Sequence, residues 1–158
     1  MDVLAASAAE VVLMHAKGLP ETMQDNPTYD DVADEVMRYL EDRIAACEAA
    51  GIRRDRIIAD PGIGFGKSFR HNLLLFAALP KFRGLGVRIL VGASRKGFIG
   101  WLTGVEQAEQ RLGGSIGAAL AALQNGADVL RVHDVAETVQ AMTVYQAAMR
   151  GQPDGSDR

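Results

Sequence analysis

The sequence predicts an α/β fold built on a parallel sheet. Short runs rich in β-branched and aliphatic residues alternate four times with longer helical stretches, a pattern typical of βα units. Polar and glycine-rich clusters follow the ends of these runs, where parallel sheets place their ligands. Because a complete (β/α)8 barrel has roughly 200 to 250 residues, four units in 158 residues correspond to half of one.

The first two units occupy the N-terminal half of the chain. We expect a strand over 11–15, then a polar loop and a helix over about 30–50. The next strand, 56–60, leads through a glycine-rich loop into a helix near 71–79, which Pro80 helps to end.

The last two units follow the same pattern. A strand over 87–94 precedes a long, glycine-containing connection with room for a short extra helix, and then a helix over about 115–125. A strand over 128–133 and a helix over about 135–149 complete the series.

The composition is that of an ordinary globular domain, with 48% hydrophobic and 23% charged residues. We expect one partial-barrel domain over 1–150 and a disordered tail over 151–158. A formal net charge of -3 argues against a nucleic-acid or acidic-membrane surface, which needs clustered Lys and Arg. The single cysteine, Cys47, excludes an internal disulfide and is predicted to be a small buried apolar group. Without a signal peptide or a membrane-spanning apolar run, the expected compartment is the cytoplasm.

The sharpest motif follows the second strand and reads Asp60-Pro-Gly-Ile-Gly-Phe-Gly-Lys67. The carboxylate of Asp60 can accept two hydrogen bonds, which suits an amino-pyrimidinone edge with its adjacent amine and ring N–H. Gly62, Gly64 and Gly66 let the backbone approach a flat ligand closely. The alternatives are that Asp60 only caps a helix or forms a turn, and that the loop binds a dinucleotide. The spacing does not give G-x-G-x-x-G, which weakens the dinucleotide interpretation.

A second motif, Ser94-Arg-Lys96, ends the third strand. A lysine held over a site can donate hydrogen bonds and place positive charge beside a leaving anion, and Lys96 is predicted to have that role. Arg95 fits a structural ion pair equally well.

A third motif, Arg131-Val-His133, lies at the end of the last strand. Alternation along a strand places Arg131 and His133 on the same side. A guanidinium and an imidazole on an apolar strand are costly unless a ligand uses them, and a phosphate or pyrophosphate would do so. The alternative for His133 is a hydrogen-bonded core histidine.

Four other residues allow a structural interpretation. Met14 could pad an aromatic ligand or belong to the core. His15 is expected to be a packed, hydrogen-bonded histidine rather than a catalyst, and His71 and Asn72 are expected to cap a helix.

Together these motifs resemble the dihydropteroate synthases of folate biosynthesis, over about residues 8–150. Leu13-Met-His15, Thr22-Met-Gln24 and the run from Val132 to Thr138 extend the resemblance. It implies the last four βα units, strands 5–8, of a (β/α)8 barrel. It also implies a transferase that joins 6-hydroxymethyl-7,8-dihydropterin pyrophosphate to 4-aminobenzoate, giving 7,8-dihydropteroate and pyrophosphate.

The resemblance also implies residue roles. Asp60 would bind the pterin ring, Met14, Gly64 and Phe65 would line its pocket, and Lys96 would contact the pterin and border the 4-aminobenzoate.

Arg131 would stack on the pterin and, with His133, hold the pyrophosphate, to which Mg²⁺ is expected to bind. The predicted catalytic residues are therefore Lys96, Arg131 and His133, and no side chain of this chain is predicted to ligate a metal.

The sequence departs from the family pattern at two points. Gly97 stands where many members have a serine that helps to hold the carboxylate of 4-aminobenzoate, which puts affinity for that substrate and for sulfonamides in doubt. The first four strands, with an Asn linked to Mg²⁺, are absent, and residues 1–10 look like the end of the helix before the fifth strand. We therefore expect weak or no activity from the chain alone, and pairing with a missing N-terminal half or a homodimer.

Two other functions stay open. A pterin-binding methyltransferase shares part of such a site, although Arg131 and His133 favour the synthase because methyl transfer has no pyrophosphate to hold. A non-catalytic half-barrel that binds pterin or phosphate is the other alternative.

Overall fold

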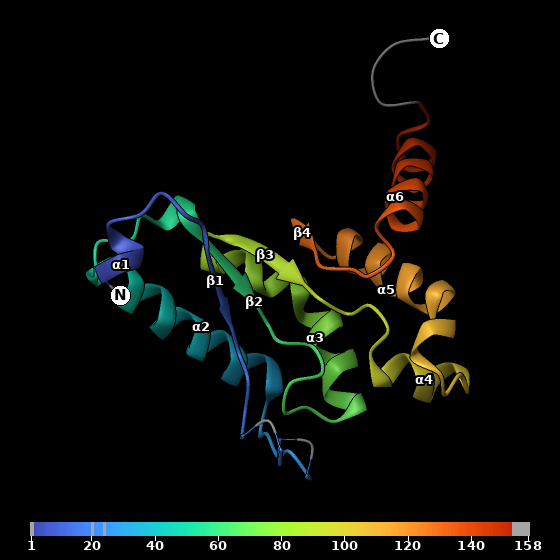
Figure 1. The fold of residues 1–158 in the computed structure, drawn as a ribbon, viewed down its shortest axis with the longest axis horizontal. Helices are drawn as coiled ribbons and strands as arrows, with labels where there is room; N and C mark the ends of the chain where they lie inside the picture. Colours follow the sequence, from blue (N-terminus) through green and yellow to red (C-terminus); the bar gives the residue numbers. More distant parts are fainter. Residues whose placement is uncertain (1, 20, 24, 153–158) are drawn as a thin grey trace.

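A computed structural model shows the fold and describes residues 2–19, 21–23 and 25–152 (Figure 1). Within these residues, four strands form one sheet in the order β1-β2-β3-β4, and each neighbouring pair is parallel. The strands are β1 (Val11–Met14), β2 (Ile57–Asp60), β3 (Arg88–Val91) and β4 (Val129–Leu130). The predicted parallel α/β fold and the positions of its strands are therefore confirmed.

Helices connect the strands. The α-helices are α1 (Asp2–Ala5), α2 (Val32–Ala49), α3 (Phe69–Phe82), α4 (Gly97–Thr103), α5 (Leu112–Gln124) and α6 (Val135–Arg150). The 3-10 helices are η1 (Arg54–Arg56), η2 (Arg83–Leu85) and η3 (Ala108–Gln110). α4 is the short extra helix predicted after the third strand, and α1 matches the helical end predicted within 1–10. In the part of the chain that the structure describes, no helix is long and apolar enough to cross a bilayer.

The hydrophobic core lies between the sheet and the helices α2 and α3, which run beside each other (Figure 1). α2 begins at Asp31, whose Oδ1 accepts hydrogen bonds from the N–H groups of Ala33 and Asp34. Its buried residues follow helical spacing: Val32, Val36, Leu40, Ile44 and Cys47. Cys47 is 1% exposed, which confirms it as a buried apolar group. The tail predicted to be disordered lies mostly outside the described residues.

The prediction that Pro80 ends a helix is wrong. α3 continues through Pro80 to Phe82. Proline has no N–H, so the carbonyl of Phe76, four residues earlier, lacks its helical donor. The side-chain Nδ2 of Asn125, at the end of α5, donates to that carbonyl at 3.3 Å. A tertiary contact therefore replaces the lost helical bond, while Leu79 and Phe82 stay fully buried.

The last two strands are shorter than predicted. β3 ends at Val91 and β4 at Leu130, although the Arg131 N–H still donates to the Val91 carbonyl at 3.0 Å. Arg131 and His133 thus lie in the loop after β4. The alternation rule that placed both on one side of a strand does not apply to them.

The core face of α3 offers a matched test. Leu75 is 0% exposed, whereas its neighbour Leu74 is 47% exposed. We expect Leu75→Ala to lower the free energy of unfolding by about 3 kcal/mol through lost packing and the cavity left behind. Leu74→Ala should cost less than about 1 kcal/mol. Urea denaturation followed by circular dichroism measures both, and equal losses would contradict the packing of α3 described above.

Candidate active site

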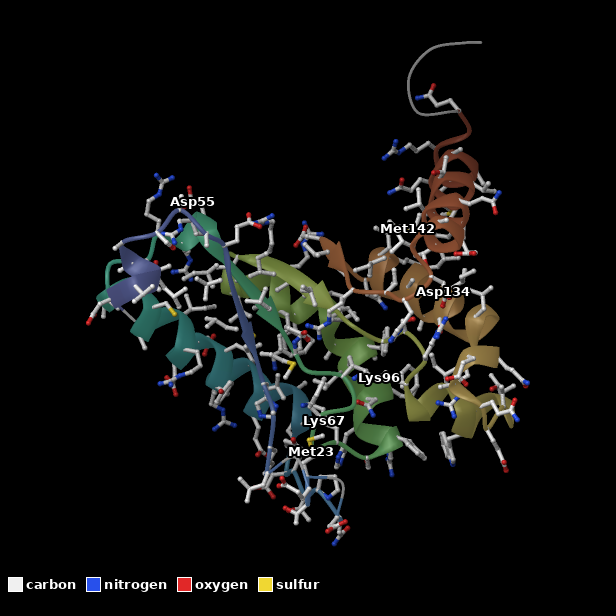
Figure 2. The ribbon with its side chains drawn as sticks, in the orientation of Figure 1. Met23, Asp55, Lys67, Lys96, Asp134 and Met142 are labelled. Atoms are coloured by element: carbon white, nitrogen blue, oxygen red, sulfur yellow. The ribbon has the colours of Figure 1, made fainter. Side chains whose placement is uncertain are left out.

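The candidate site lies at the carboxyl ends of the strands. Asp60 is the last residue of β2, is 1% exposed, and pairs in register with Met14, the last residue of β1. Figure 2 shows Lys67 and Lys96 near this end of the sheet and Asp55 at the opposite end. Parallel strands bring the loops after their carboxyl ends together, which places three of the predicted motifs at one edge.

The carboxylate of Asp60 has two different partners. Its Oδ1 accepts from the Gly62 N–H at 2.8 Å, so the predicted turn-forming role is present. Its Oδ2 accepts from Nη2 of Arg131 at 3.0 Å. Burial raises the pKa of Asp60, while the Gly62 N–H and the charges of Arg131, Lys67 and Lys96 act in the opposite direction.

The guanidinium of Arg131 reaches Asp60 from two strands away, and Gly92 leaves room for it. A Cβ added at Gly92 would lie 3.0 Å from both Nε and Nη2 of Arg131, which is closer than side chains normally pack. The Arg131 side chain is 53% exposed, against 1% for Asp60. The Asp60 side of this ion pair is therefore buried, and the Arg131 side is half exposed.

The glycine-rich loop packs against the loop that follows β1. Gly62 and Gly66 have φ angles of 70° and 64°, and a Cβ on either would lie 1.8 Å from the His15 carbonyl oxygen or 2.1 Å from that of Lys17. These two glycines are thus required by contact with another backbone, rather than by approach to a ligand. Of the three glycines in this loop, Gly64 is the one that faces a predicted site residue, since its Cβ would meet Cδ of Lys96 at 3.1 Å.

Lys96 and Phe65, which the resemblance assigns to the same pterin pocket, lie in contact. Nζ of Lys96 lies 4.1 Å from the centre of the Phe65 ring, in cation–π contact. Burial and the charge of Arg131 lower the pKa of Lys96, and the charge of Asp60 raises it. Three cations, Arg131, Lys67 and Lys96, therefore act on the Asp60 carboxylate, and one of them lies over an aromatic ring.

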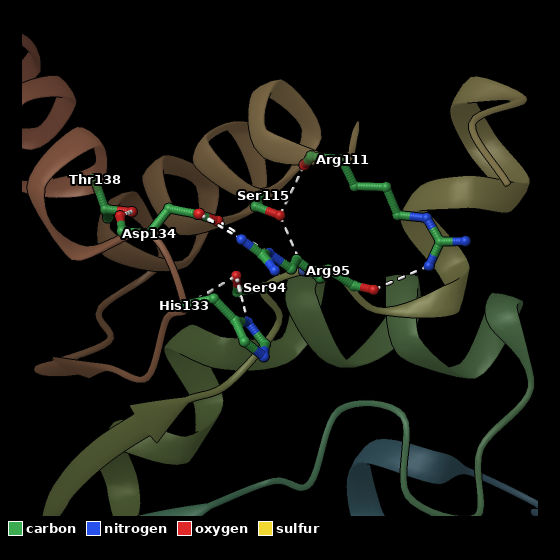
Figure 3. A network of polar contacts seen from close by, with 7 residues as sticks. All are labelled: Ser94, Arg95, Arg111, Ser115, His133, Asp134 and Thr138. Atoms are coloured by element: carbon green, nitrogen blue, oxygen red, sulfur yellow. Dashed lines mark hydrogen bonds and ion pairs between the residues drawn. The ribbon is translucent and has the colours of Figure 1, made fainter. Parts of the chain in front are cut away.

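His133 lies over Ser94 rather than in the core. Its Nδ1 is 3.0 Å from the Ser94 hydroxyl, which also accepts from the His133 N–H at 3.3 Å (Figure 3). Both His133 and Arg131 are exposed. The argument that burial on an apolar strand would force these two groups to hold a ligand is therefore wrong, although both lie beside the site.

Arg95 has the structural role that was left open. Its Nε and Nη2 donate to the two carboxylate oxygens of Asp134, at 3.2 and 2.6 Å, and its N–H donates to the Ser115 hydroxyl (Figure 3). Nη1 of Arg111 donates to the Arg95 carbonyl at 2.9 Å. This network fixes Arg95 at a φ of 61°, so the chain turns sharply just before Lys96.

Two residues with important contacts were given no site role from the sequence. Lys67 is 1% exposed, and its Nζ contacts Nδ1 of His15 at 2.9 Å. Asn72 accepts from the Gly64 N–H at 2.7 Å and donates to the Ser68 carbonyl, so it supports the glycine-rich loop rather than capping α3. His71 forms a capping box with Ser68 as predicted, and His15 is packed and hydrogen-bonded as predicted.

A cleft of about 550 Å³ opens next to Lys96. It lies between the loops that follow β1, β2 and β3, and a flat aromatic molecule fits a space of this size. The lining residues are Asn26, Pro27, Gly64, Lys67, Ser68, Phe69, Asn72, Lys96, Gly97 and Phe98. Gly64 and Lys96 are the predicted site residues among them.

The side chains of this site do not fit a metal ion directly. Among the residues described, no three His, Cys, Asp or Glu side chains lie together in a group that could hold one. Both oxygens of the Asp60 carboxylate already accept hydrogen bonds. The expected Mg²⁺ therefore stays a prediction about the pyrophosphate of a substrate.

A buried carboxylate at a strand end, with cations beside it, is suited to a heterocycle that presents N–H donors and carries an attached anion. Residues 1–133 match the family described as pterin binding enzyme, and the chain belongs to that family. Within it, the chain is similar to dihydropteroate synthases. It is 47% identical over 149 residues to the Escherichia coli K12 enzyme, covering 94% of this chain and 52% of that protein.

Solved structures agree with this assignment. The chain is 51% identical to dihydropteroate synthase from Xanthomonas albilineans in complex with 7,8-dihydropteroate, with a TM-score of 0.87 over 94% of this chain and 53% of that one. The same enzyme with 4-aminobenzoic acid gives 54% identity and a TM-score of 0.82, over 89% and 49%. These enzymes are (β/α)8 barrels, which confirms the predicted fold class. The chain spans about half the length of the curated relatives it matches.

His15 predicts how stability depends on pH. Burial and the charges of Lys67 and Lys17 lower the pKa of His15 from 6.5 to about 4. Between these pH values the unfolded chain binds a proton that the folded chain does not, so stability falls as the pH drops from 6.5 to 4, by up to about 3 kcal/mol.

Urea denaturation at several pH values measures this loss. His15→Asn should flatten the curve between pH 6.5 and 4, because Asn does not titrate there. A slope in His15→Asn as steep as in the unchanged chain would contradict the expectation.

Proposed function

We propose that this chain supplies one half of a dihydropteroate synthase active site. The reaction condenses 6-hydroxymethyl-7,8-dihydropterin pyrophosphate with 4-aminobenzoate, giving 7,8-dihydropteroate and pyrophosphate. The observation that carries the proposal is the buried Asp60 carboxylate, with Arg131 at 3.0 Å and the Lys96–Phe65 pair beside it. The similarity to an enzyme solved with 7,8-dihydropteroate supports it.

Asp60 would bind the pterin through the ring amine and the adjacent ring N–H, which form two parallel hydrogen bonds to a carboxylate. This requires Oδ2 of Asp60 to release Arg131, whose side chain is 53% exposed. Met14, paired with Asp60 in the sheet, and Phe65 would contact the ring faces. Lys96 would donate a hydrogen bond to the pterin from above Phe65.

The cations near Asp60 would assist departure of the pyrophosphate. The bond between the pterin methylene carbon and the pyrophosphate oxygen breaks, and its electron pair leaves with the oxygen. Arg131 is suited to bidentate contact with the anion, and Lys96 and His133 add further donors. The amine of 4-aminobenzoate then attacks the methylene carbon and loses a proton, which completes the condensation.

The 4-aminobenzoate would lie in the cleft beside Lys96. Gly97 and Phe69 both line the cleft, and a Cβ added at Gly97 would lie 3.4 Å from the Phe69 ring, which offers an apolar face to the benzoate ring. In this orientation the amine would lie on the pterin side of Lys96 and the carboxylate near Gly97.

Three further parts of the proposal concern the setting of the reaction. Mg²⁺ would be carried by the pyrophosphate, in line with the absence of a three-residue ligand group among the described residues. The complete site would need either an N-terminal half that supplies four more βα units or a second copy of the chain. The cytoplasm is the compartment we propose for folate synthesis by this enzyme.

Two other functions would be recognised by their binding behaviour. A pterin-binding methyltransferase would bind methyltetrahydrofolate and gain nothing from pyrophosphate. A non-catalytic half-barrel would bind pterin without turnover in any mixture. The similarity to synthases over 94% of the chain favours the synthase.

Mixing tests the proposal directly. The purified chain is assayed with the dihydropterin pyrophosphate, 4-aminobenzoate and Mg²⁺, alone and with the separately produced N-terminal half of the E. coli enzyme. We expect turnover on mixing, and Asp60→Asn should lower kcat/KM by roughly a hundredfold or more, because an amide would meet the pterin donors with its own N–H₂.

Asp55→Asn is the matched control for that substitution, since Asp55 is exposed and lies at the opposite end of the sheet. Turnover by the chain alone would favour completion of the site by a second copy. Full activity of Asp60→Asn, or neither turnover nor pterin binding in the mixture, would reject the proposal.

Gly97 provides a gain-of-affinity test. A serine Cβ at this position would meet the Phe69 ring at 3.4 Å, an ordinary contact, and its hydroxyl could donate to the benzoate carboxylate. A hydrogen bond to a charged group contributes about 1.5 kcal/mol or more, so Gly97→Ser should lower the KM for 4-aminobenzoate by roughly tenfold in the mixed enzyme.

Gly117→Ser is its control, because an added Cβ at Gly117 meets nothing within 4 Å. An unchanged or higher KM in Gly97→Ser would place the carboxylate elsewhere.

A further inference from the structure

We propose that Lys67 is a positioning residue: anchored to His15, it fixes the glycine-rich loop, residues 61–67, and with it the carboxylate of Asp60. The importance of Asp60 rests on the proposed function, whereas the contacts of Lys67 are independent of it. Among the described residues, Lys67 is one of the largest side chains with less than 2% exposure. A buried ammonium is costly unless each of its donors is satisfied.

The ammonium of Lys67 finds three acceptors. Its Nζ lies 2.9 Å from Nδ1 of His15, 2.9 Å from the Phe65 carbonyl and 3.4 Å from the His15 carbonyl. These match the three donors of a protonated lysine. Two acceptors belong to His15, the first residue of the loop after β1, and one belongs to the glycine-rich loop, so a single group joins the two loops.

The state of His15 fits this role. Its pKa is lowered to about 4, so the ring is neutral at pH 7, and in the tautomer with the proton on Nε2 its Nδ1 accepts from Lys67. The His15 ring is held edge-on to Tyr39, with centroids 4.9 Å apart at 86°, and lies 6.2 Å from the ring of Tyr29. The acceptor that receives Lys67 is therefore itself held in place.

A second hydrogen bond connects the same two loops. The Tyr29 hydroxyl donates to the Gly66 carbonyl at 2.7 Å, and burial raises the pKa of Tyr29 to about 12, so the donor keeps its proton. Gly62 and Gly66 already lie on the carbonyls of His15 and Lys17. The glycines permit this close approach, and the Lys67 and Tyr29 contacts hold it.

The charge of Lys67 also acts on the site. Burial lowers the pKa of Lys67 to about 7, the charge of Asp60 raises it, and Lys17 lowers it further. Reciprocally, Lys67 is one of three cations, with Arg131 and Lys96, that favour the ionised form of Asp60. Lys67 differs from the other two because it is buried, so its charge stays in place when a ligand arrives.

The experiment compares Lys67→Met, which keeps the length of the side chain and removes its charge and donors, with Lys81→Met, which removes an exposed charge on α3. Two quantities are measured by NMR in the intact chain: the pKa of the Asp60 carboxyl and the hydrogen-exchange rates of the Gly62, Gly64 and Gly66 amides. Lys67→Met should raise the Asp60 pKa by about one pH unit and speed exchange at least about tenfold. Lys81→Met should change neither.

Substitutions at His15 supply a rescue test. His15→Asn places an acceptor oxygen close to the position of Nδ1 and should keep most of the loop protection, whereas His15→Leu should match Lys67→Met. An equal loss of loop hydrogen-exchange protection in both His15 variants would overturn the proposal. An unchanged Asp60 pKa and unchanged exchange rates in Lys67→Met would also overturn it.

If Lys67→Met does not fold, an NMR titration of the unchanged chain tests the positioning role. With ¹⁵N-labelled lysine, the Lys67 ammonium should titrate near pH 7 together with the Gly62 and Gly66 amide shifts. Titration near the ordinary lysine value, with no response of these amides, would overturn the proposal.

The mixed enzyme separates this proposal from the proposed function. A Lys67→Met mixture with an unchanged pH profile of kcat/KM would reject the positioning role and leave the synthase intact. If Lys67→Met changes the Asp60 pKa and the loop exchange rates as expected while the unchanged mixture is inactive, the positioning role is retained and the synthase is rejected.

Discussion

The contact between two loop backbones is the constraint on which this site depends. Gly62 and Gly66 lie against the carbonyls of His15 and Lys17 so closely that no Cβ fits at either position. This contact places the loop after β2 under the loop after β1, which in turn positions Phe65 and Gly64 beneath Lys96. The helices and the core support the arrangement, but the approach of these two backbones determines where the site residues lie.

Much of the fold followed from local pattern. The switch between short apolar runs and helical periodicity placed all four strands and the main helices. The errors lay at the ends of helices and strands, because residues distant in the sequence determine where these elements end. A rule based on proline alone could not reveal that Asn125, 49 residues from Phe76, completes the hydrogen bonding of α3. Likewise, the last register pair between β3 and β4 is Val91 with Leu130, and the sequence that continues through Arg131 and Val132 does not show that the strand ends there.

The site was predictable where its residues follow strand ends. Asp60 and Lys96 were found in this way, because parallel sheets gather such residues at one edge. Lys67 and Arg95 were not resolved, since their partners His15 and Asp134 are 52 and 39 residues away. A lysine in a polar loop is usually solvated. Only the packing of the loop shows that this one is buried.

The ion pair between Asp60 and Arg131 has a consequence for selectivity between ligands. Any pterin that binds Asp60 must first displace a guanidinium held at 3.0 Å. Under the proposed function, a pterin carrying pyrophosphate offers the displaced guanidinium a new anion, whereas the condensed product does not. The same arginine would then help to retain the substrate and, once the pyrophosphate has left, return to Asp60 and compete with the product. Product release would thus be driven by Arg131 as it forms its ion pair with Asp60 again.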